Sequence, residues 1–443
     1  MDFYGDDLLL GTPAARELYA SVRDLPILDY HCHLDQFAIA RDDKFGDVGE
    51  LWLGADHYKW RAMRMCGVDE ELITGGAPMR DKFMAYAACM PRLAGNPLYY
   101  WTQLELKNIF GINEPLDSDS AADIYDRANE RLKELSVRKL LDMFKVRFIA
   151  TTDDPAGDLS AHGMAGDILV TPTFRPDRLY NGQMTALVRD LEKVTGKKIT
   201  ALSDLLGALE NRLDYFISKG CRIADHGFTR FPTAYATEKE AGAAFAKGDK
   251  ATAAEKEGLF GYLLDALARM YAARGILMQI HFSVLRNVNS RIFATQGVDR
   301  GCDVFDRSER AAGVIAFLDR TEGERPDILL YTLDPTAVPM LATLTGAFRG
   351  VRMGAAWWFN DTLLGIRRNL EQIAEYGCLG THLGMLTDSR SFSSYSRFEF
   401  FRRILCDYVG GMVDRGEYSA RSAERLVRDI CYGNIAERLG MEQ

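Results

Sequence analysis

The chain has 443 residues, 47% of them hydrophobic and 26% charged, and its formal net charge at neutral pH is −9. This composition is enough for a large core, and the dispersed acidic charge leaves no basic face for nucleic acid. Acidic residues stand at the N-terminus where a secretory signal needs basic ones, and no uncharged apolar run reaches the ~18 residues of a membrane span. We therefore expect a cytoplasmic protein that binds neither nucleic acid nor membrane.

The cysteines give no sign of a disulfide framework or a zinc knuckle. There are eight, and no two of them form a C-x-x-C pair. Buried free thiols in a reducing compartment are the expected state. Their positions are 32, 66, 89, 221, 302, 378, 406 and 431.

Short apolar, β-rich runs alternate with helical stretches along most of the chain. Near-continuous apolar strands between helices predict a parallel sheet that is covered on both faces. Eight such units favour a closed (β/α)8 barrel of the TIM type over an open sheet. The predicted strands are 27–33, 146–151, 168–174, 222–226, 276–282, 328–333, 351–358 and 383–388.

Long helical segments interrupt this pattern. Residues 34–145 predict a helical insertion after the first strand, 178–220 are also helical, and 238–258 predict an exposed helix rich in Ala, Lys and Glu. The link 152–167 is short for a crossover helix, so the barrel pattern is weakest there. The expected division is an N-terminal segment 1–26, a barrel of 27–33 and 146–394, the insertion 34–145, and C-terminal helices over 395–443.

Polar residues gather where the predicted strands end, which is where barrels of this type carry their chemistry. Four of the seven histidines fall at strand ends. Random placement would not favour one end of the strands. The residues concerned are His31 and His33 on the first strand, Asp225 and His226 on the fourth, His281 on the fifth, Trp357 and Trp358 on the seventh, and Asp388, with Arg390 two residues on, at the eighth.

The H-x-H pair His31 and His33 predicts half of a metal site. Alternate side chains share a strand face ~7 Å apart, so both imidazoles can reach one ion at ~2.1 Å while Cys32 points away. Alone, H-x-H is more often structural than functional. Asp388 ends the eighth strand, the neighbour of the first in a closed barrel, and supplies an anionic ligand. The three together predict a site for one divalent metal.

Several of these residues also allow a purely structural interpretation. Asp388 could cap the following helix, although an acid and Arg390 on one short turn suit carboxylate recognition better. His226 precedes a glycine and could be a turn residue as readily as a ligand or substrate contact. His281 follows an apolar run and is expected to point into the barrel mouth. His57 and two further histidines, His162 and His382, lie away from strand ends, where solvated or packing roles are expected.

The tryptophans and arginines leave a similar choice. Trp357 and Trp358 are equally compatible with ordinary core and with a wall for a sugar ring. Arg286 follows the fifth strand in an amide-rich loop, where a solvated position is the simplest interpretation. Arginine beside asparagine at a barrel mouth also suits an anionic, hydroxylated substrate.

With these residues in view, the chain resembles the uronate (glucuronate) isomerase family, an outlying branch of the amidohydrolase superfamily. The resemblance spans residues 28–406 and therefore nearly the whole chain. The motifs that carry it are "LDYHCHL", "LWLGADHYKWRAMR", "CRIADHGF", "QIHFSVLRNVNSR", "GAAWWFND" and "GMLTDSRSFSSYSRFEFFRRILC".

The resemblance implies a (β/α)8 barrel that interconverts D-glucuronate with D-fructuronate and D-galacturonate with D-tagaturonate. It implies one divalent ion, usually zinc, on His31, His33 and Asp388. It further implies that Asp388, Tyr58 and Arg390 are catalytic. Substrate contacts are expected from His281, Arg286 and Trp357, with His57, His226 and Trp358 as further candidates.

This isomerisation moves a carbonyl from C1 to C2 through a cis-enediol. Asp388 is the leading base for the C2 proton, and Tyr58 and Arg390 are its proton-handling and electrostatic partners. One alternative is a metal-dependent hydrolase of the same superfamily, which needs ligands on the fifth and sixth strands. The sixth strand ends in "TLDP" without a histidine. A second alternative is a non-catalytic sugar-acid binding protein. Exposed helices would also allow self-association into a homo-oligomer.

Overall fold

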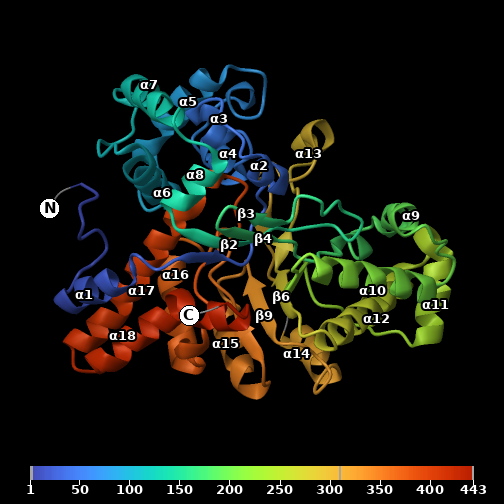
Figure 1. Cartoon of the computed structure of the whole chain (residues 1–443). Helices are drawn as coiled ribbons and strands as arrows, with labels where there is room; N and C mark the ends of the chain where they lie inside the picture. Colours follow the sequence, from blue (N-terminus) through green and yellow to red (C-terminus); the bar gives the residue numbers. More distant parts are fainter. Residues whose placement is uncertain (1–2, 309–310, 442–443) are drawn as a thin grey trace.

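The computed structural model describes residues 3–308 and 311–441, in which parallel strands alternate with helices (Figure 1). Two four-stranded sheets have the orders β1-β2-β4-β3 and β10-β9-β6-β5, and β7 and β8 form a separate two-stranded antiparallel sheet. The strands are β1 Ile27–Asp29, β2 Val146–Ala150, β3 Gly163–Ala165, β4 Ile168–Thr171, β5 Ile223–Gly227, β6 Leu277–Phe282, β7 Val284–Leu285, β8 Val304–Phe305, β9 Ile328–Thr332 and β10 Val351–Met353.

The two larger sheets join at the end of β4. Phe174 forms a parallel bridge with Ala224 of β5, and its amide donates to the carbonyl of Ile223 at 3.1 Å. Neighbouring parallel segments therefore run in the order β1, β2, β4, β5, β6, β9 and β10. Their inward residues are almost wholly buried, as the continuous apolar runs predicted.

Residues 383–388, the predicted eighth strand, lie beside the end of β1 but do not form a strand. The amide of Asp388 donates to the carbonyl of His31 at 3.1 Å, and that of His33 donates to Ser389 at 2.9 Å. Gly384 (φ 78°) and Asp388 (φ 47°) have left-handed backbones, which interrupt the extended conformation. A Cβ on Gly384 would lie 2.3 Å from the Ile430 carbonyl, so only glycine fits there.

The first and seventh predicted strands are shorter than expected. β1 ends at Asp29, so His31 and His33 lie on the segment that follows it. β10 ends at Met353, before the two tryptophans. At that point a Cβ on Gly354 would lie 1.9 Å from the Tyr331 ring, and a turn follows in which the Asn360 amide donates to the Trp357 carbonyl at 2.7 Å.

The short link 152–167 contains the strand β3 instead of a crossover helix. β3 pairs antiparallel with β4, and Gly166 (φ 65°) lies in the tight turn between them. Because this hairpin stays at the sheet edge, the connection needs few residues. The link 152–167 lacks a crossover helix because it forms the hairpin of β3 and β4 instead.

The insertion 34–145 is helical, as predicted, and forms a group at the top of the view in Figure 1. Its interior is aromatic, with the Trp52 ring stacked on Phe83 at 5.6 Å between ring centroids. The helices of the insertion are α2 Gln36–Arg41, α3 Val48–Leu53, α4 His57–Met65, α5 Met79–Cys89, α6 Pro97–Glu105, α7 Ala121–Leu132 and α8 Val137–Met143.

Helices also follow the later strands. The predicted helix over 238–258 is two helices, because Thr237 and Thr252 each begin one with a reciprocal capping box. These helices are α9 Met184–Thr195, α10 Leu202–Ser218, α11 Glu238–Lys247, α12 Ala253–Ala272, α13 Ser290–Gln296, α14 Ala311–Arg320, α15 Val338–Ala347 and α16 Leu363–Tyr376.

The two ends of the chain pack together. α1 Pro13–Val22 packs against α17 Ser396–Asp414 and α18 Ala420–Arg428 (Figure 1), and α19 Asn434–Arg438 is the last helix of the chain. A Cβ on Gly410 would lie 2.4 Å from the Ala15 amide nitrogen, so this glycine permits the close approach of α1 and α17.

All eight cysteines are free thiols. Five are buried as expected, whereas Cys66 and Cys302 are partly exposed and Cys378 is exposed. Among the described helices, none is both long and apolar enough to cross a membrane.

Candidate active site

A cavity of about 530 Å³ opens where the parallel strands end. Most of the residues predicted from strand ends and from the family motifs line it, so segments far apart in sequence converge here. Those residues are His31, His33, His57, His281, Arg286, Trp357, Trp358, Asp388 and Arg390.

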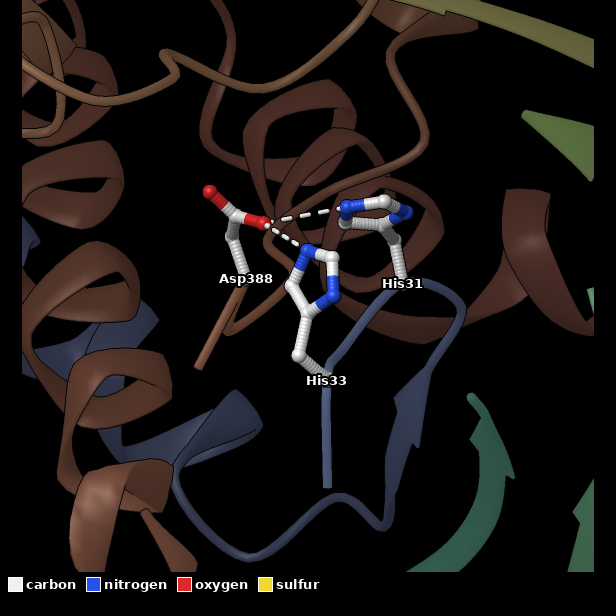
Figure 2. A group of neighbouring side chains, drawn as sticks. All are labelled: His31, His33 and Asp388. Atoms are coloured by element: carbon white, nitrogen blue, oxygen red, sulfur yellow. Dashed lines mark hydrogen bonds and ion pairs between the residues drawn. The ribbon is translucent and has the colours of Figure 1, made fainter. Parts of the chain in front are cut away.

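His31, His33 and Asp388 meet at one point in this cavity (Figure 2). The Nε2 atoms of His31 and His33 lie 3.0 and 3.2 Å from the same Asp388 oxygen, Oδ1. Cys32 turns away, and its thiol faces the Ala150 carbonyl at 3.5 Å. Two imidazole nitrogens and a carboxylate oxygen that converge in this way suit a divalent transition metal.

The Asp388 carboxylate is held by a third donor as well. Trp357 Nε1 donates to Oδ2 at 2.8 Å, so both carboxylate oxygens have partners. Burial opposes ionisation, but the hydrogen bonds from His31 and His33 hold the pKa of Asp388 well below its usual range. Asp388 does not cap the next helical turn, since Ser391 does. Asp388 is therefore an ionised, oriented carboxylate.

The two histidines differ in their proton affinity. Burial lowers the pKa of His33 to about 4. Burial would lower the pKa of His31 too, but the Asp225 and Asp388 carboxylates outweigh it and raise that pKa. Only a neutral imidazole binds a metal, so protons compete with the metal more strongly at His31 than at His33.

Metal binding is therefore expected to weaken as the pH falls. Below the raised pKa of His31 the metal competes with a proton, and the apparent affinity should drop by about tenfold per pH unit. Above that pKa the affinity should level off. Titration of the metal-free protein with Zn²⁺ between pH 5.5 and 8.5 measures this dependence, and an affinity that does not change with pH would contradict His31 as a ligand.

Asp225 organises a second group of polar residues, of which His281 and Arg175 line the cavity. His281 Nδ1 lies 2.7 Å from Asp225 Oδ1, and the guanidinium of Arg175 lies 3.1 Å from Oδ2. Asp225 and His281 also group with His31 within metal-binding distances. However, Arg175 already neutralises Asp225, which makes a second cation here unfavourable. Burial lowers the pKa of His281, so it is neutral, and its Nε2 has no protein partner among the described residues.

Arg175 is a cavity residue that the sequence analysis missed. It follows the predicted third strand directly, so the strand-end rule could have identified it. Its Nε also donates to Asp177 at 2.7 Å. A Cβ on Gly227 would lie 2.6 Å from the Arg175 guanidinium and 3.3 Å from that of Arg286, so the glycine allows both cations to approach the same point.

Arg286 and Arg390 are held by acids from the segment between β7 and β8. Arg390 pairs with Asp299 at 2.8 Å and Arg286 with Asp303 at 3.3 Å. These two ion pairs hold both arginines at the cavity.

Two predicted site residues, Tyr58 and His226, lie outside the cavity. His226 is fully buried on the opposite face of β5 from Asp225, between the rings of Tyr180 and Tyr271. Burial lowers its pKa to about 4, so it is a neutral core residue. A contact between His226 and substrate does not fit this position, because successive strand residues face opposite ways. Tyr58 lies behind the cavity wall, and its hydroxyl donates to Asp361 at 2.9 Å.

The remaining histidines have varied positions. His57 lines the cavity and packs edge-on against Trp358 at 4.8 Å between ring centroids, so it is no distant surface residue. His162 is buried and contacts the Thr151 hydroxyl at 2.8 Å. His382 is buried and stacks on Phe401. The packing roles expected for His162 and His382 agree with these positions.

Comparisons with known proteins cover nearly the full chain. The family model described as glucuronate isomerase matches residues 1–438. A uronate isomerase from Marinomonas sp. (strain MWYL1) is 42% identical over 99% of each chain, and one from Caldicellulosiruptor saccharolyticus is 40% identical over 99% of each chain.

Solved structures give the same result. The uronate isomerase of Thermotoga maritima superposes with a TM-score of 0.96 at 35% identity and covers 99% of this chain and 100% of its own. A putative metal-dependent hydrolase from Lactobacillus casei shares the fold alone, with a TM-score of 0.55 at 15% identity over 96% of this chain and 97% of its own. The family match and the full-length relatives show that this chain belongs to the glucuronate isomerase family.

Proposed function

We propose that the protein is a uronate isomerase that interconverts D-glucuronate with D-fructuronate and D-galacturonate with D-tagaturonate. The observation that carries this proposal is the convergence of His31, His33 and Asp388 with Arg390 in one cavity of a chain from this family. The substrate is then a small hexuronate anion, and the cationic side chains at the cavity suit its carboxylate.

The metal in this proposal is one divalent ion, zinc, held by His31, His33 and Asp388. The donor set fits, because two imidazole nitrogens face one carboxylate oxygen. Such an ion would polarise a substrate oxygen and offset the negative charge that develops on it.

The protein groups supply the proton transfers. Asp388 takes the proton from C2 and returns one to C1, and its ionised state and its hydrogen bond from Trp357 prepare it for that task. Arg390 stabilises the negative charge of the enediolate. His281 and Arg286 bind the hydroxyls and carboxylate, with Arg175 as a further cation.

The architecture that fits this function is a closed (β/α)8 barrel. Seven parallel segments follow in order from β1 to β10, and residues 383–389 lie beside β1. Pairing of that segment with β10 would close the ring. The division into segment 1–26, barrel, insertion 34–145 and C-terminal helices 395–443 is part of this proposal.

The proposal is tested by incubating the purified, metal-loaded protein with each hexuronate and measuring ketose formation. We expect both D-glucuronate and D-galacturonate to be converted. If neither isomerises while an N-acyl or lactone substrate is hydrolysed, the isomerase assignment is wrong and a superfamily hydrolase replaces it.

Arg286→Met should raise KM more than it lowers kcat. The variant keeps most of the side-chain volume but removes the cation that faces the cavity, so substrate binding weakens while the proton-transfer groups stay in place. Loss of a charge-assisted hydrogen bond predicts a KM about 10-fold higher or more. Steady-state kinetics measure both constants, and Arg320→Met, on the outer helix α14, serves as the control. A variant with unchanged KM and reduced kcat would contradict a binding role.

A further inference from the structure

A buried hydrogen-bonded pair, Tyr58 and Asp361, lies behind the cavity wall. The Tyr58 hydroxyl donates to Asp361 Oδ2 at 2.9 Å, and the two residues are only 6% and 4% exposed. They come from α4 and from the turn after β10, 303 positions apart in the chain. The sequence analysis assigned a role to Tyr58 but none to Asp361.

The turn that carries Asp361 is firmly held. The side-chain amide of Asn360 donates to the carbonyls of Thr332 and Leu333, at 3.0 Å each, at the end of β9. The same turn places Trp357 against Asp388. The Asp361 carboxylate is therefore fixed relative to the strand ends that form the site.

A buried cation lies beside the pair. The Arg397 guanidinium is 4.9 Å from the Tyr58 ring centroid, and it donates to the Thr387 carbonyl, next to Asp388, at 2.7 Å. Burial raises the pKa of Asp361 to about 6, and the charge of Arg397 limits this rise. This carboxyl group can therefore release and take up a proton near neutral pH.

Tyr58 is separated from the cavity by a single layer of side chains. Its ring packs 5.1 Å from the His57 ring and 5.3 Å from that of Trp358, and both of these residues line the cavity. The phenol thus lies one layer of side chains from the cavity, and a bridging water is required between its oxygen and a substrate hydroxyl.

The hydrogen bond determines how the phenol can act. An ionised carboxylate only accepts hydrogen bonds, so the single proton of Tyr58 points to Asp361. The phenol oxygen is left as an acceptor for a second group. A tyrosine without this partner could point its proton at another group, and its oxygen would then no longer be held as an acceptor for a second group.

We propose that Asp361 is a positioning residue of the isomerase reaction that acts through Tyr58. As the Tyr58 oxygen takes the proton from the substrate O2 hydroxyl, the phenol proton moves to Asp361. The reverse movement delivers a proton to O1, so both residues end in their starting state and only a proton has passed from O2 to O1. This inference rests on the proposed isomerase function.

A double-mutant cycle in the full-length, metal-loaded enzyme tests the proposal. Asp361→Asn keeps the size of the side chain but cannot take a proton, and we expect kcat to fall about 10-fold or more with KM nearly unchanged. Added to Tyr58→Phe, the same change should lower kcat by less than about threefold, because the two residues act as a unit. Asp265→Asn is the matched control, since Asp265 is a buried acid that pairs with Arg320 at 2.9 Å on outer helices.

The outcomes are distinct. The role of Asp361 would be wrong if Asp361→Asn kept the wild-type kcat, or if it lowered kcat by the same factor in the wild-type and Tyr58→Phe backgrounds. Either result would leave the proposed isomerase function intact. A wild-type protein that isomerises neither hexuronate would overturn the proposed function and this inference together. If Asp361→Asn does not fold, as judged by thermal unfolding, Asp361→Glu is measured in the same cycle. It keeps the carboxylate, so its loss of kcat should again disappear in the Tyr58→Phe background.

Discussion

Asp388→Asn is expected to lower kcat by about 10²–10⁴-fold while KM changes much less, because a positioned base contributes to the transition state. Asparagine keeps the size of the side chain and its hydrogen bond from Trp357 Nε1, but it cannot accept a proton from carbon. The low pKa of Asp388 keeps the wild-type group ionised throughout the working pH range, so the loss should not depend on pH. Steady-state assays of both hexuronates measure it.

Metal content must be measured on the same Asp388→Asn sample. Asp388 is also the proposed anionic ligand, and a loss of metal would deepen the loss of rate. Reloading with Zn²⁺ separates the two effects, because an enzyme with restored metal but without its base stays slow. A near wild-type rate with metal bound would mean that Asp388 is only a ligand, and Tyr58 or His281 would become the candidate base.

His33→Ala is expected to lose the bound divalent metal without unfolding. Removing a direct ligand should weaken metal affinity by more than the about 10–100-fold that loss of an outer hydrogen-bond partner costs. The His33 side chain lies at a cavity and is 21% exposed, so its removal leaves little void in the core. Metal analysis of purified protein and thermal unfolding measure the two expectations.

A matched histidine is available as the control for His33→Ala. His382 is buried and stacks on Phe401, away from the cavity, so His382→Ala should keep its metal and lose stability instead. Equal metal content in His33→Ala and the wild type would show that the H-x-H pair is a packing feature.

Much of the fold could be predicted because buried parallel strands are short, continuous apolar runs. β2, β6 and β9 agree with their predicted ranges to within one residue at each end. Residues 383–388 have the same apolar appearance, but Gly384 and Asp388 adopt left-handed backbones. That conformation depends on contacts with Ile430 and with the end of β1, which no local pattern reveals.

The site was predictable to the extent that it follows strand ends. The cavity brings together the strand-end residues His31, His33, His281 and Asp388, as expected. The same strand-end rule could have identified Arg175. The substrate contact considered for His226 does not fit its buried position, because successive strand residues point to opposite faces and His226 faces away from Asp225 into the core. The partnership of Tyr58 with Asp361 depends on how α4 packs against the turn after β10, so it required the structure.

The most direct test of the central claim follows the C2 hydrogen. D-Glucuronate deuterated at C2 is converted in ordinary water by the metal-loaded enzyme, and the D-fructuronate formed is examined by NMR. Proton transfer through Asp388 at a water-accessible cavity predicts that C1 of the product carries hydrogen from solvent in place of much of the deuterium. Complete transfer of deuterium from C2 to C1 would contradict a base that exchanges its proton with water, and it would leave either a base shielded from solvent or a direct hydride shift between C1 and C2.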